Sequence, residues 1–268
     1  MARVNQVYGC LPAKIDLRDY KLGAFQMKLP PEFALSNLPR VKNQQNVRSC
    51  VAHAMSSILE YFEKGKTNLS TEFIYGIQKK LFNYNGTGMY LQNACKIVQK
   101  YGNMIETDCP GNTEVPKCRG AAEEAFTNLY KRAKAYSYKV RLYFTCKTAD
   151  DIKKTILKYG PVLASIKWFD DYKCNDKGVL YKSSNKKTFG YHAVMVYGWN
   201  KEGFLCQNSW GENWGNKGRF ILPYSISFAE AKGFADGPNP NIKIPKNNKL
   251  LNKMYKAINS TLDIFKIT

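Results

Sequence analysis

One cysteine in the stretch VRSCVAHAM, residues 47–55, stands where it could act as a nucleophile. Its type alone says little, because the chain has eight cysteines and a free cysteine usually behaves as a small buried apolar side chain. A nucleophilic cysteine needs a favoured thiolate, a base within reach, a group that orients the base, and donors for the oxyanion that forms. Cys50 is therefore a candidate nucleophile only if other parts of the chain supply these groups.

The position of Cys50 favours a thiolate. The apolar side chains that follow at helical spacing predict a helix over residues 50–62, and they are Val51, Met55, Ile58, Leu59 and Phe62. Ser49 is a good candidate for the N-cap, which places Cys50 in the first helical turn. The positive end of a helix dipole lowers the pKa of a thiol, and a neighbouring imidazolium does the same.

The chain has two histidines, and they differ as candidate bases. His53 follows Cys50 by one helical turn, so its side chain points along the same helix and suits a packed core position. His192 lies in GYHAVMVYGWN, a run typical of a strand, and could approach Cys50 across a cleft. His192 is therefore the candidate base.

Three further side chains complete a possible catalytic set. Asn208, in QNSWGENWG, could orient the imidazole, and Trp210 of the same run could shield it from water. Gln44 stands six residues before Cys50, where its amide could lie beside the Cys50 backbone N–H and form an oxyanion hole. Glutamine and asparagine are usually surface residues, so the argument depends on their joint occurrence in this order.

These segments resemble the signature of the papain-like cysteine peptidases. That signature has a glutamine six residues before a Ser-Cys helix start, then a His-Ala-Val strand, then Asn-Ser-Trp-Gly-x-x-Trp-Gly; this chain has QQNVRSCVAHA, YHAVMVYGW and NSWGENWG. The resemblance covers roughly residues 28–236 and implies peptide hydrolysis without a metal or other cofactor. It implies that Cys50 is the nucleophile, His192 its ion-pair partner and general acid, and Asn208 the orienting group. Gln44 and the Cys50 N–H would form the oxyanion hole.

The resemblance also implies substrate-binding positions, namely Arg48, Ser49, Gly88, Met89, Ser165, Tyr191, Ala193 and Trp210. Where the family usually has Cys-Gly-Ser-Cys-Trp, this chain has VRSCV, so Val47 removes the partner of a disulfide common near the site. Arg48 replaces a glycine beside the primary subsite; it is either a solvated charge or a group that narrows the subsite and favours acidic side chains. Gly88 and Met89 stand where the family has a glycine pair that binds the substrate backbone.

Helical and strand patterns separate along the chain. Helices are expected over residues 50–62, 71–82, 89–102, 121–136 and 148–160, and strands over 161–169, 191–199, 203–210 and 218–224. Such segregation indicates an α+β protein. The resemblance implies a papain-like two-lobe fold, with a helical lobe, an antiparallel β-sheet or barrel lobe, and the active site in the cleft between them.

We expect three parts along the chain. Residues 28–236 form the papain-like domain, and residues 1–27, which contain YGCLPAKIDLRDY, form an N-terminal arm. The arm either covers part of the cleft or packs on the back of the fold, and a mixed disulfide between Cys10 and Cys50 is a further option beside a plain surface thiol at Cys10. Residues 237–268 form a basic C-terminal extension with a helical face made of Leu250, Met254, Ile258 and Leu262.

Composition limits the partners. The 268 residues carry a formal net charge of +20, but the lysines are scattered and no nucleic-acid motif is visible, so no nucleic-acid partner is expected. No stretch approaches the roughly 18 apolar residues of a membrane span, and the start lacks a signal-peptide pattern. We expect protein or peptide substrates, a monomer, and a cytoplasmic or virion-associated location unless the chain is cut from a longer precursor.

Other functions remain open at this point. A transglutaminase-type acyltransferase also uses cysteine and histidine, but it would need an acidic residue in place of Asn208. A catalytically silent binding protein of the same fold is the main alternative, against which the complete catalytic set argues. A nucleic-acid binder rests on charge only. Among the cysteines, only Cys109 and Cys118 have the spacing of a local disulfide.

Overall fold

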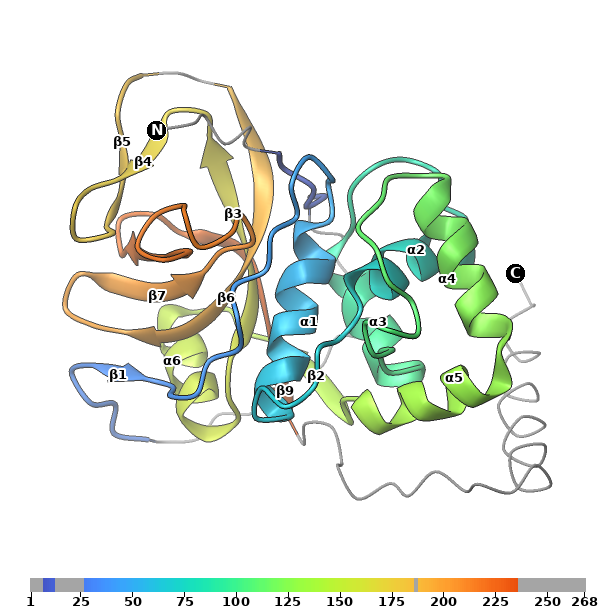
Figure 1. The fold of residues 1–268 in the computed structure, drawn as a ribbon. Coiled ribbons are helices and arrows are strands. Elements are labelled where there is room, and N and C mark those ends of the chain that lie inside the picture. The colour runs from blue at the N-terminus through green and yellow to red at the C-terminus, as the bar shows by residue number, and fades with distance from the viewer. Residues whose placement is uncertain (1–6, 13–26, 186–187, 236–268) are drawn as a thin grey trace.

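The computed structural model describes residues 7–12, 27–185 and 188–235, so the expectations for most of the N-terminal arm and for the extension after residue 236 lie outside the described residues. Figure 1 shows two lobes side by side, one built of helices and one of a twisted sheet, with helix α1 (Cys50–Phe62) at their boundary. This arrangement confirms the predicted α+β class with a helical and an antiparallel sheet lobe.

The helical lobe contains α1 and the helices that follow it, which are α2 (Thr71–Leu81), α3 (Leu91–Lys100), α4 (Lys117–Thr127), α5 (Leu129–Ala135) and the short 3-10 helix η1 (Tyr136–Tyr138). The helices predicted over 50–62, 71–82 and 89–102 are confirmed. The single helix predicted over 121–136 is wrong, because the chain breaks at Asn128. The backbone of Asn128 is extended, and its side chain accepts the N–H of Lys131 and so caps a new helix.

The main sheet has the order β2-β9-β3-β6-β7-β8, and all its pairs are antiparallel. Its strands are β2 (Leu142–Thr145), β3 (Val162–Phe169), β6 (Phe189–Trp199), β7 (Gly203–Gln207), β8 (Arg219–Pro223) and β9 (Phe228–Ala235), and β1 (Phe33–Ala34) pairs with β6. A separate hairpin pairs β4 (Tyr172–Cys174) with β5 (Leu180–Lys182). Helix α6 (Ala149–Lys158) lies within the range predicted over 148–160 and begins with a capping box between Thr148 and Asp151.

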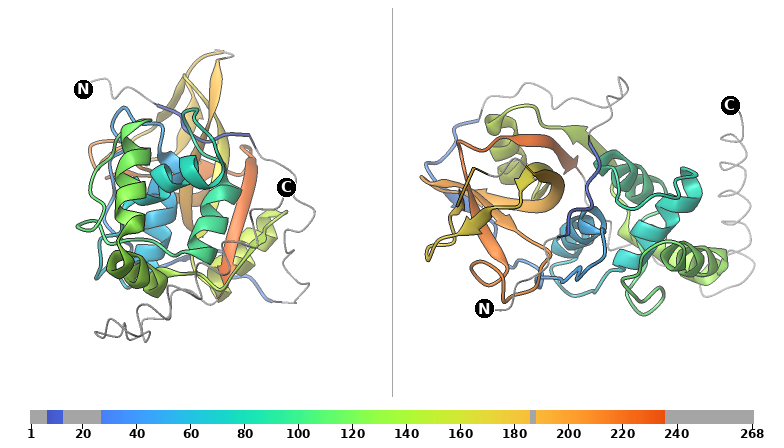
Figure 2. Two further views of the ribbon diagram at one scale, coloured as in Figure 1. Left: turned by 90° about the vertical axis from the view of Figure 1, so that its right-hand side faces the viewer. Right: turned by 90° about the horizontal axis from the view of Figure 1, so that it is seen from above.

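Strand β6 is buried on both faces, which explains its continuous apolar run. Ala193 and Met195 belong to the core that contains α1, α2 and α3, whereas Val194 and Val196 belong to the core of the sheet lobe. Successive strand residues point to opposite faces, so one strand serves both cores. The first turn of α1 therefore packs directly against the sheet (Figure 2).

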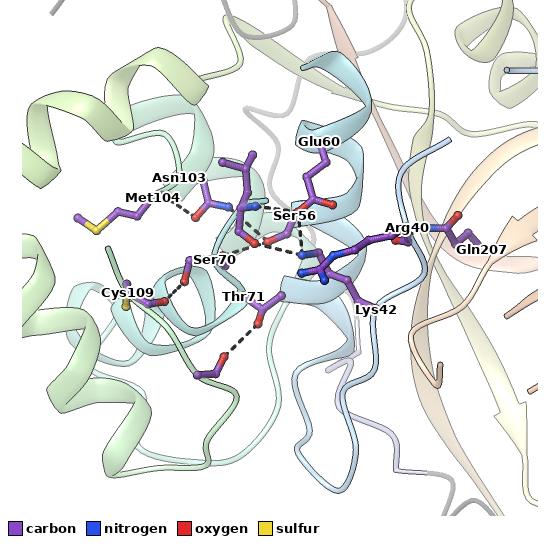
Figure 3. A network of polar contacts seen from close by, with 12 residues as sticks. Arg40, Lys42, Ser56, Glu60, Ser70, Thr71, Asn103, Met104, Cys109 and Gln207 are labelled. Carbon is purple, nitrogen blue, oxygen red and sulfur yellow. Dashed lines mark hydrogen bonds and ion pairs between the residues drawn. The ribbon is translucent and has the colours of Figure 1, made fainter. Parts of the chain in front are cut away.

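A buried polar network fixes the segment that leads to Gln44. The ammonium of Lys42 lies 2.8 Å from a carboxylate oxygen of Glu60 on α1, and it also donates to the carbonyl of Leu69. Glu60 accepts the backbone N–H of Leu69 at 2.7 Å, and the side chains of Lys42 and Glu60 are only 6% and 2% exposed. Figure 3 shows this pair beside Ser56 and Ser70, which link α1 to the start of α2.

Breaking this buried ion pair should destabilise the protein strongly. Lys42→Met leaves the Glu60 carboxylate buried without its cation, and such a loss typically costs about 3–5 kcal/mol of unfolding free energy. Lys80→Met is the matched control, since Nζ of Lys80 lies 3.9 Å from Glu123 and its side chain is 43% exposed. An exposed pair of this kind contributes about 0–1 kcal/mol. Urea unfolding of both variants measures the difference, and equal midpoints would contradict the assigned role of the pair.

Candidate active site

Cys50 is the first residue of α1 and is completely buried. Backbone hydrogen bonds from Ala193, the residue after His192, and from Gly9 reach its sulfur. Burial nevertheless dominates and raises the pKa of the Cys50 thiol to about 11, because a thiolate without water is costly. The sequence-based expectation of a favoured thiolate is therefore wrong for the arrangement in this structure, in which the thiol is the stable form.

His192 on β6 is held by Asn208 and covered by tryptophans. Its Nε2 lies 2.7 Å from Oδ1 of Asn208, an oxygen that also accepts the N–H of Ser209, so Nε2 carries the proton. Nδ1 is buried and has no hydrogen-bond partner among the described residues, which leaves it as the basic nitrogen. Trp210 stacks on the imidazole with ring centroids 4.5 Å apart. Burial lowers the pKa of His192 to about 4, and the Asn208 hydrogen bond opposes this shift.

Gln44 lies on the other side of Asn208, and Ser209 joins the two. The hydroxyl of Ser209 donates to Oε1 of Gln44 at 2.7 Å, and its backbone N–H donates to Asn208. The amide nitrogen of Gln44 then points away from Ser209 and donates to the carbonyl of Val7 at 3.1 Å, as well as to that of Val47. Gln44 is fully buried, so its amide presents a fixed donor to a peptide carbonyl.

The described part of the N-terminal arm, residues 7–12, lies across these groups. The ring of Tyr8 lies 6.5 Å from those of both His192 and Trp210, and its hydroxyl donates to Asp170. The backbone N–H of Met89 donates to the carbonyl of Gly9 at 2.7 Å, and the N–H of Leu11 donates to Met89. Figure 1 shows this segment in dark blue at the N-terminal end of α1. The arm therefore buries the candidate catalytic residues.

The predicted substrate-binding positions gather around the arm with one exception. Gly88 and Met89 border its backbone on one side. On the other side the carbonyl of Tyr191 accepts the N–H of Cys10, and a side-chain hydrogen bond joins Cys10 to Ser165. Ala193 is buried next to Cys50.

Ser49 is the exception. Its hydroxyl does not cap α1; it lies within hydrogen-bond distance of Asn112 and His53 in the interior. Arg48 is exposed; its guanidinium contacts Thr87 at 3.4 Å, and its backbone N–H donates to Glu114.

The second histidine and the remaining cysteines lie outside the proposed catalytic set. His53 is a core residue as expected, and burial lowers its pKa to about 3. None of the eight cysteines forms a disulfide, so the expected Cys109–Cys118 disulfide is wrong, and Cys10 is buried rather than on the surface. Burial raises the thiol pKa of Cys10 well above its usual range. Within the described ranges, no helix is long and apolar enough to cross a membrane, and no cluster of three potential metal ligands occurs.

The sequence did not reveal a set of residues that hold the backbone around the site in place. Glu114 accepts the N–H of Arg48 at 2.6 Å and the hydroxyl of Tyr75 at 2.8 Å, and that hydroxyl in turn accepts the N–H of Gly88. Asn112 donates to the carbonyl of Gln44. None of these residues lies in a recognisable motif, since each acts through contacts between segments far apart in the sequence.

Comparison with known families identifies the class of protein. A family described as "Papain family cysteine protease" matches residues 32–230. The chain belongs to this papain family of cysteine proteases, as the resemblance predicted.

Individual relatives agree with this assignment. Cathepsin B-like cysteine proteinase 3 of Caenorhabditis elegans is 36% identical over 131 residues, which are 47% of this chain and 35% of that protein. A peptidase C1-like protein of Acanthamoeba polyphaga mimivirus is 29% identical over 203 residues, which are 68% of this chain and 63% of that protein. The chain thus spans about a third of the length of the cathepsin B-like relative.

The fold is also similar to solved structures. The structure of xylellain, a cysteine protease from Xylella fastidiosa, aligns with a TM-score of 0.72 at 22% identity, covering 88% of this chain and 98% of that one. Digestive procathepsin L 3 of Tenebrio molitor aligns with a TM-score of 0.63 at 18% identity, covering 87% of this chain and 76% of that one. These likenesses confirm the papain-like fold.

Alkylation of Cys50 should report on its burial. In the unaltered chain, iodoacetamide should label Cys50 slowly at pH ~7, because with a pKa of about 11 the thiolate is scarce until the pH rises far above neutrality. In Gly9→Val, a Cβ at residue 9 would lie 2.0 Å from the carbonyl oxygen of Arg48, so the arm cannot dock. Water then reaches the sulfur, its pKa falls, and labelling at pH ~7 should rise at least about tenfold, one pKa unit being a factor of ten in thiolate.

Gly120→Ala is the control for this experiment, since a Cβ at Gly120 meets nothing within 4 Å. Peptide mapping separates Cys50 from the other seven cysteines. Equal labelling rates of Cys50 in Gly9→Val and in Gly120→Ala would contradict burial by the arm.

Proposed function

We propose that this chain is a cysteine peptidase that hydrolyses peptide bonds with Cys50 as the nucleophile, His192 as acid and base, Asn208 as the orienting group, and Gln44 with the Cys50 N–H as the oxyanion hole. The observation that carries the proposal is the linkage of Gln44 and Asn208 through the single residue Ser209. That linkage fixes an amide donor and the imidazole of His192 with one side chain, beside the sulfur-contacting backbone of Ala193. A packed core alone does not need such a linkage.

The chemistry follows from these positions. Nδ1 of His192 takes the proton of the Cys50 thiol, and the sulfur attacks the carbonyl carbon of the peptide bond. The negative oxygen of the tetrahedral intermediate accepts from Gln44 and from the Cys50 N–H. The imidazolium then gives its proton to the leaving amine, and a thioester remains. Water hydrolyses the thioester with His192 as the base, which releases the acid product and restores the thiol.

Substrate selection is proposed to involve the residues that surround Cys10. Ser165 on β3 and Tyr191 on β6 contact Cys10, and Ala193 on β6 pairs with Ser165. These residues favour a side chain of moderate size with some polar character. Arg48 is exposed at the start of α1 and could favour an acidic side chain at the adjoining position. Protein or peptide chains are the proposed substrates.

A direct test compares two cysteine variants on a protein substrate. Cys50→Ala should abolish hydrolysis of casein under reducing conditions, because the thioester forms on the Cys50 sulfur. Cys174→Ala should leave it unchanged, since Cys174 is a partly exposed thiol on β4 in the sheet lobe. Equal activity of the two variants would refute the assignment of Cys50. A folded chain without activity in any form, including Gly9→Val, would favour the alternative of a catalytically silent binding protein.

We further propose that residues 7–12 restrain this activity. In a substrate, the leaving amine lies on the C-terminal side of the reacting carbonyl and must approach His192, so a substrate runs from the Met89 side towards the Trp210 side. The arm runs the opposite way, because Tyr8 lies by Trp210 and Leu11 follows at Met89. A chain in reverse orientation fills the cleft without presenting a peptide bond in the reactive direction.

Displacement of the arm should raise the hydrolysis rate. Gly9→Val should increase kcat/KM on a small peptide substrate under reducing conditions relative to Gly120→Ala, with the same melting temperature of the main body. The reason is that a docked arm competes with substrate for Met89 and for the amide of Gln44. Unchanged kcat/KM in a folded Gly9→Val protein would exclude an inhibitory arm, and loss of folding would show that residues 7–12 have a structural role instead.

A further inference from the structure

The side chain of Lys79 is buried against the loop that leads to Met89, the residue whose backbone contacts the N-terminal arm. Lys79 is the ninth residue of α2 and is completely buried, although it stands next to the exposed Lys80. Its ammonium donates to the carbonyl of Gly86 and to the carbonyl of Gly88, both at 2.7 Å. These carbonyls belong to the loop between α2 and α3, whose end forms the edge at Met89. The peptidase mechanism described above does not use Lys79.

The surroundings of Lys79 suit a cation. Its Nζ lies 4.4 Å from the ring centroid of Tyr75 and 4.5 Å from that of Tyr84, so two aromatic faces stabilise the charge. Burial lowers the pKa of Lys79 to about 8, partly offset by Cys118 and Glu114, so the group is mostly protonated at neutral pH. An ammonium has three donors, which lets one side chain hold two carbonyls at once.

The loop needs such a restraint. It reads FNYNGTGM and contains two glycines, and Gly88 has a φ of +83°, so its backbone has many accessible conformations. Besides Lys79, the side-chain amide of Gln78 donates to the carbonyl of Gly88 at 3.3 Å, and the hydroxyl of Tyr75 accepts the N–H of Gly88 at 3.0 Å. The hydroxyl of Tyr84 donates to the carbonyl of Thr87 at 2.8 Å. The N–H and the carbonyl of Gly88 are thus both held by side chains of α2.

Fixing Gly88 determines where the next residue points. The N–H of Met89 donates to Gly9, and the carbonyl of Met89 accepts from Leu11, so both groups face the chain in the cleft. A peptide substrate would use the same pair once the arm leaves. If the backbone at Gly88 took another conformation, the N–H and the carbonyl of Met89 could not both face the bound chain.

We propose that Lys79 is a positioning residue, whose buried ammonium holds the Gly86–Gly88 turn so that Met89 presents its N–H and C=O to the peptide backbone in the cleft. For substrates this inference rests on the proposed peptidase function, whereas for the arm it does not. The two can therefore be tested separately.

The first test uses amide hydrogen exchange of the full chain, which needs no turnover. Lys79→Met keeps a similar side-chain length but removes all three donors. Exchange of the Met89 and Leu11 amides, whose N–H groups pair across the cleft edge, should become at least about fivefold faster than in the unaltered chain. Lys80→Met is the matched control and should leave both amides unchanged, because the Lys80 side chain is 43% exposed. Exchange of the Ile58 amide in α1 reports whether the core is intact.

The second test separates binding from chemistry. In the Gly9→Val background, Lys79→Met should raise KM for a peptide substrate about fivefold to tenfold with little change in kcat, since lost backbone pairing weakens substrate and transition state alike. Lys80→Met in that background should change neither constant. Cys50 alkylation by iodoacetamide, which needs no backbone pairing, should also stay the same.

Tyr75→Phe is the second variant, because it removes only the hydroxyl that accepts from Gly88, and it should show the same effects more weakly. Unchanged Met89 exchange in a folded Lys79→Met chain would overturn the proposal. If Lys79→Met fails to fold, unchanged Met89 exchange in Tyr75→Phe overturns it and faster exchange supports it. Faster exchange without turnover in any variant would support the role of Lys79 and refute the proposed peptidase function.

Discussion

The site depends on one contact, the packing of the first turn of α1 against strand β6. Ala193 and Met195 of β6 belong to the same core as Cys50, Val51 and Met55 of α1, so the two lobes share buried surface at the catalytic position. Because strand residues alternate in direction, the neighbours of Ala193 face the tryptophan-rich core of the sheet lobe. The candidate nucleophile and base thus come from elements whose relative position is fixed by apolar packing.

Burial and the helix dipole of α1 shift the pKa of the Cys50 thiol in opposite directions at this contact. Water exclusion raises the pKa of the Cys50 thiol and lowers that of the His192 imidazole, so both groups are neutral beneath the arm. The first-turn position of Cys50 works the other way, but a helix terminus contributes only about 0.3–1 kcal/mol at exposed positions and up to about 2 kcal/mol when partly buried. Desolvation of a fully buried thiolate is larger. Arm docking and thiolate formation are therefore opposed, and whatever uncovers the sulfur also activates it.

Much of this arrangement could be predicted from the sequence, and the exceptions have a common cause. Helix α1, strand β6 and the three motifs carry local signals, namely helical spacing, β-branched runs and tryptophan-rich turns. Strand β9 was missed because FAEAKGFA contains Glu230 and Lys232, which resemble an exposed segment; in the sheet their charged groups lie 3.3 Å apart in the interior. The break at Asn128 was missed because helix-forming residues flank it on both sides. In each case contacts from distant segments outweigh local preference.

The burial of Lys79 also could not be predicted from the local sequence, and in this case the unpredicted residue has a proposed function. In the sequence IQKKLF it looks like one half of an exposed lysine pair, and only the fold shows that Lys79 is buried while Lys80 faces solvent. A methionine of similar length would fill the same space without the cost of removing a charge from water. It could not, however, donate to the carbonyls of Gly86 and Gly88. The Gly88 carbonyl would keep only the side-chain amide of Gln78 at 3.3 Å, and the loss of these donors would favour a different turn. A buried charge that holds the backbone next to Met89, which pairs with the bound arm, is better explained by the geometry of that backbone segment than by stability.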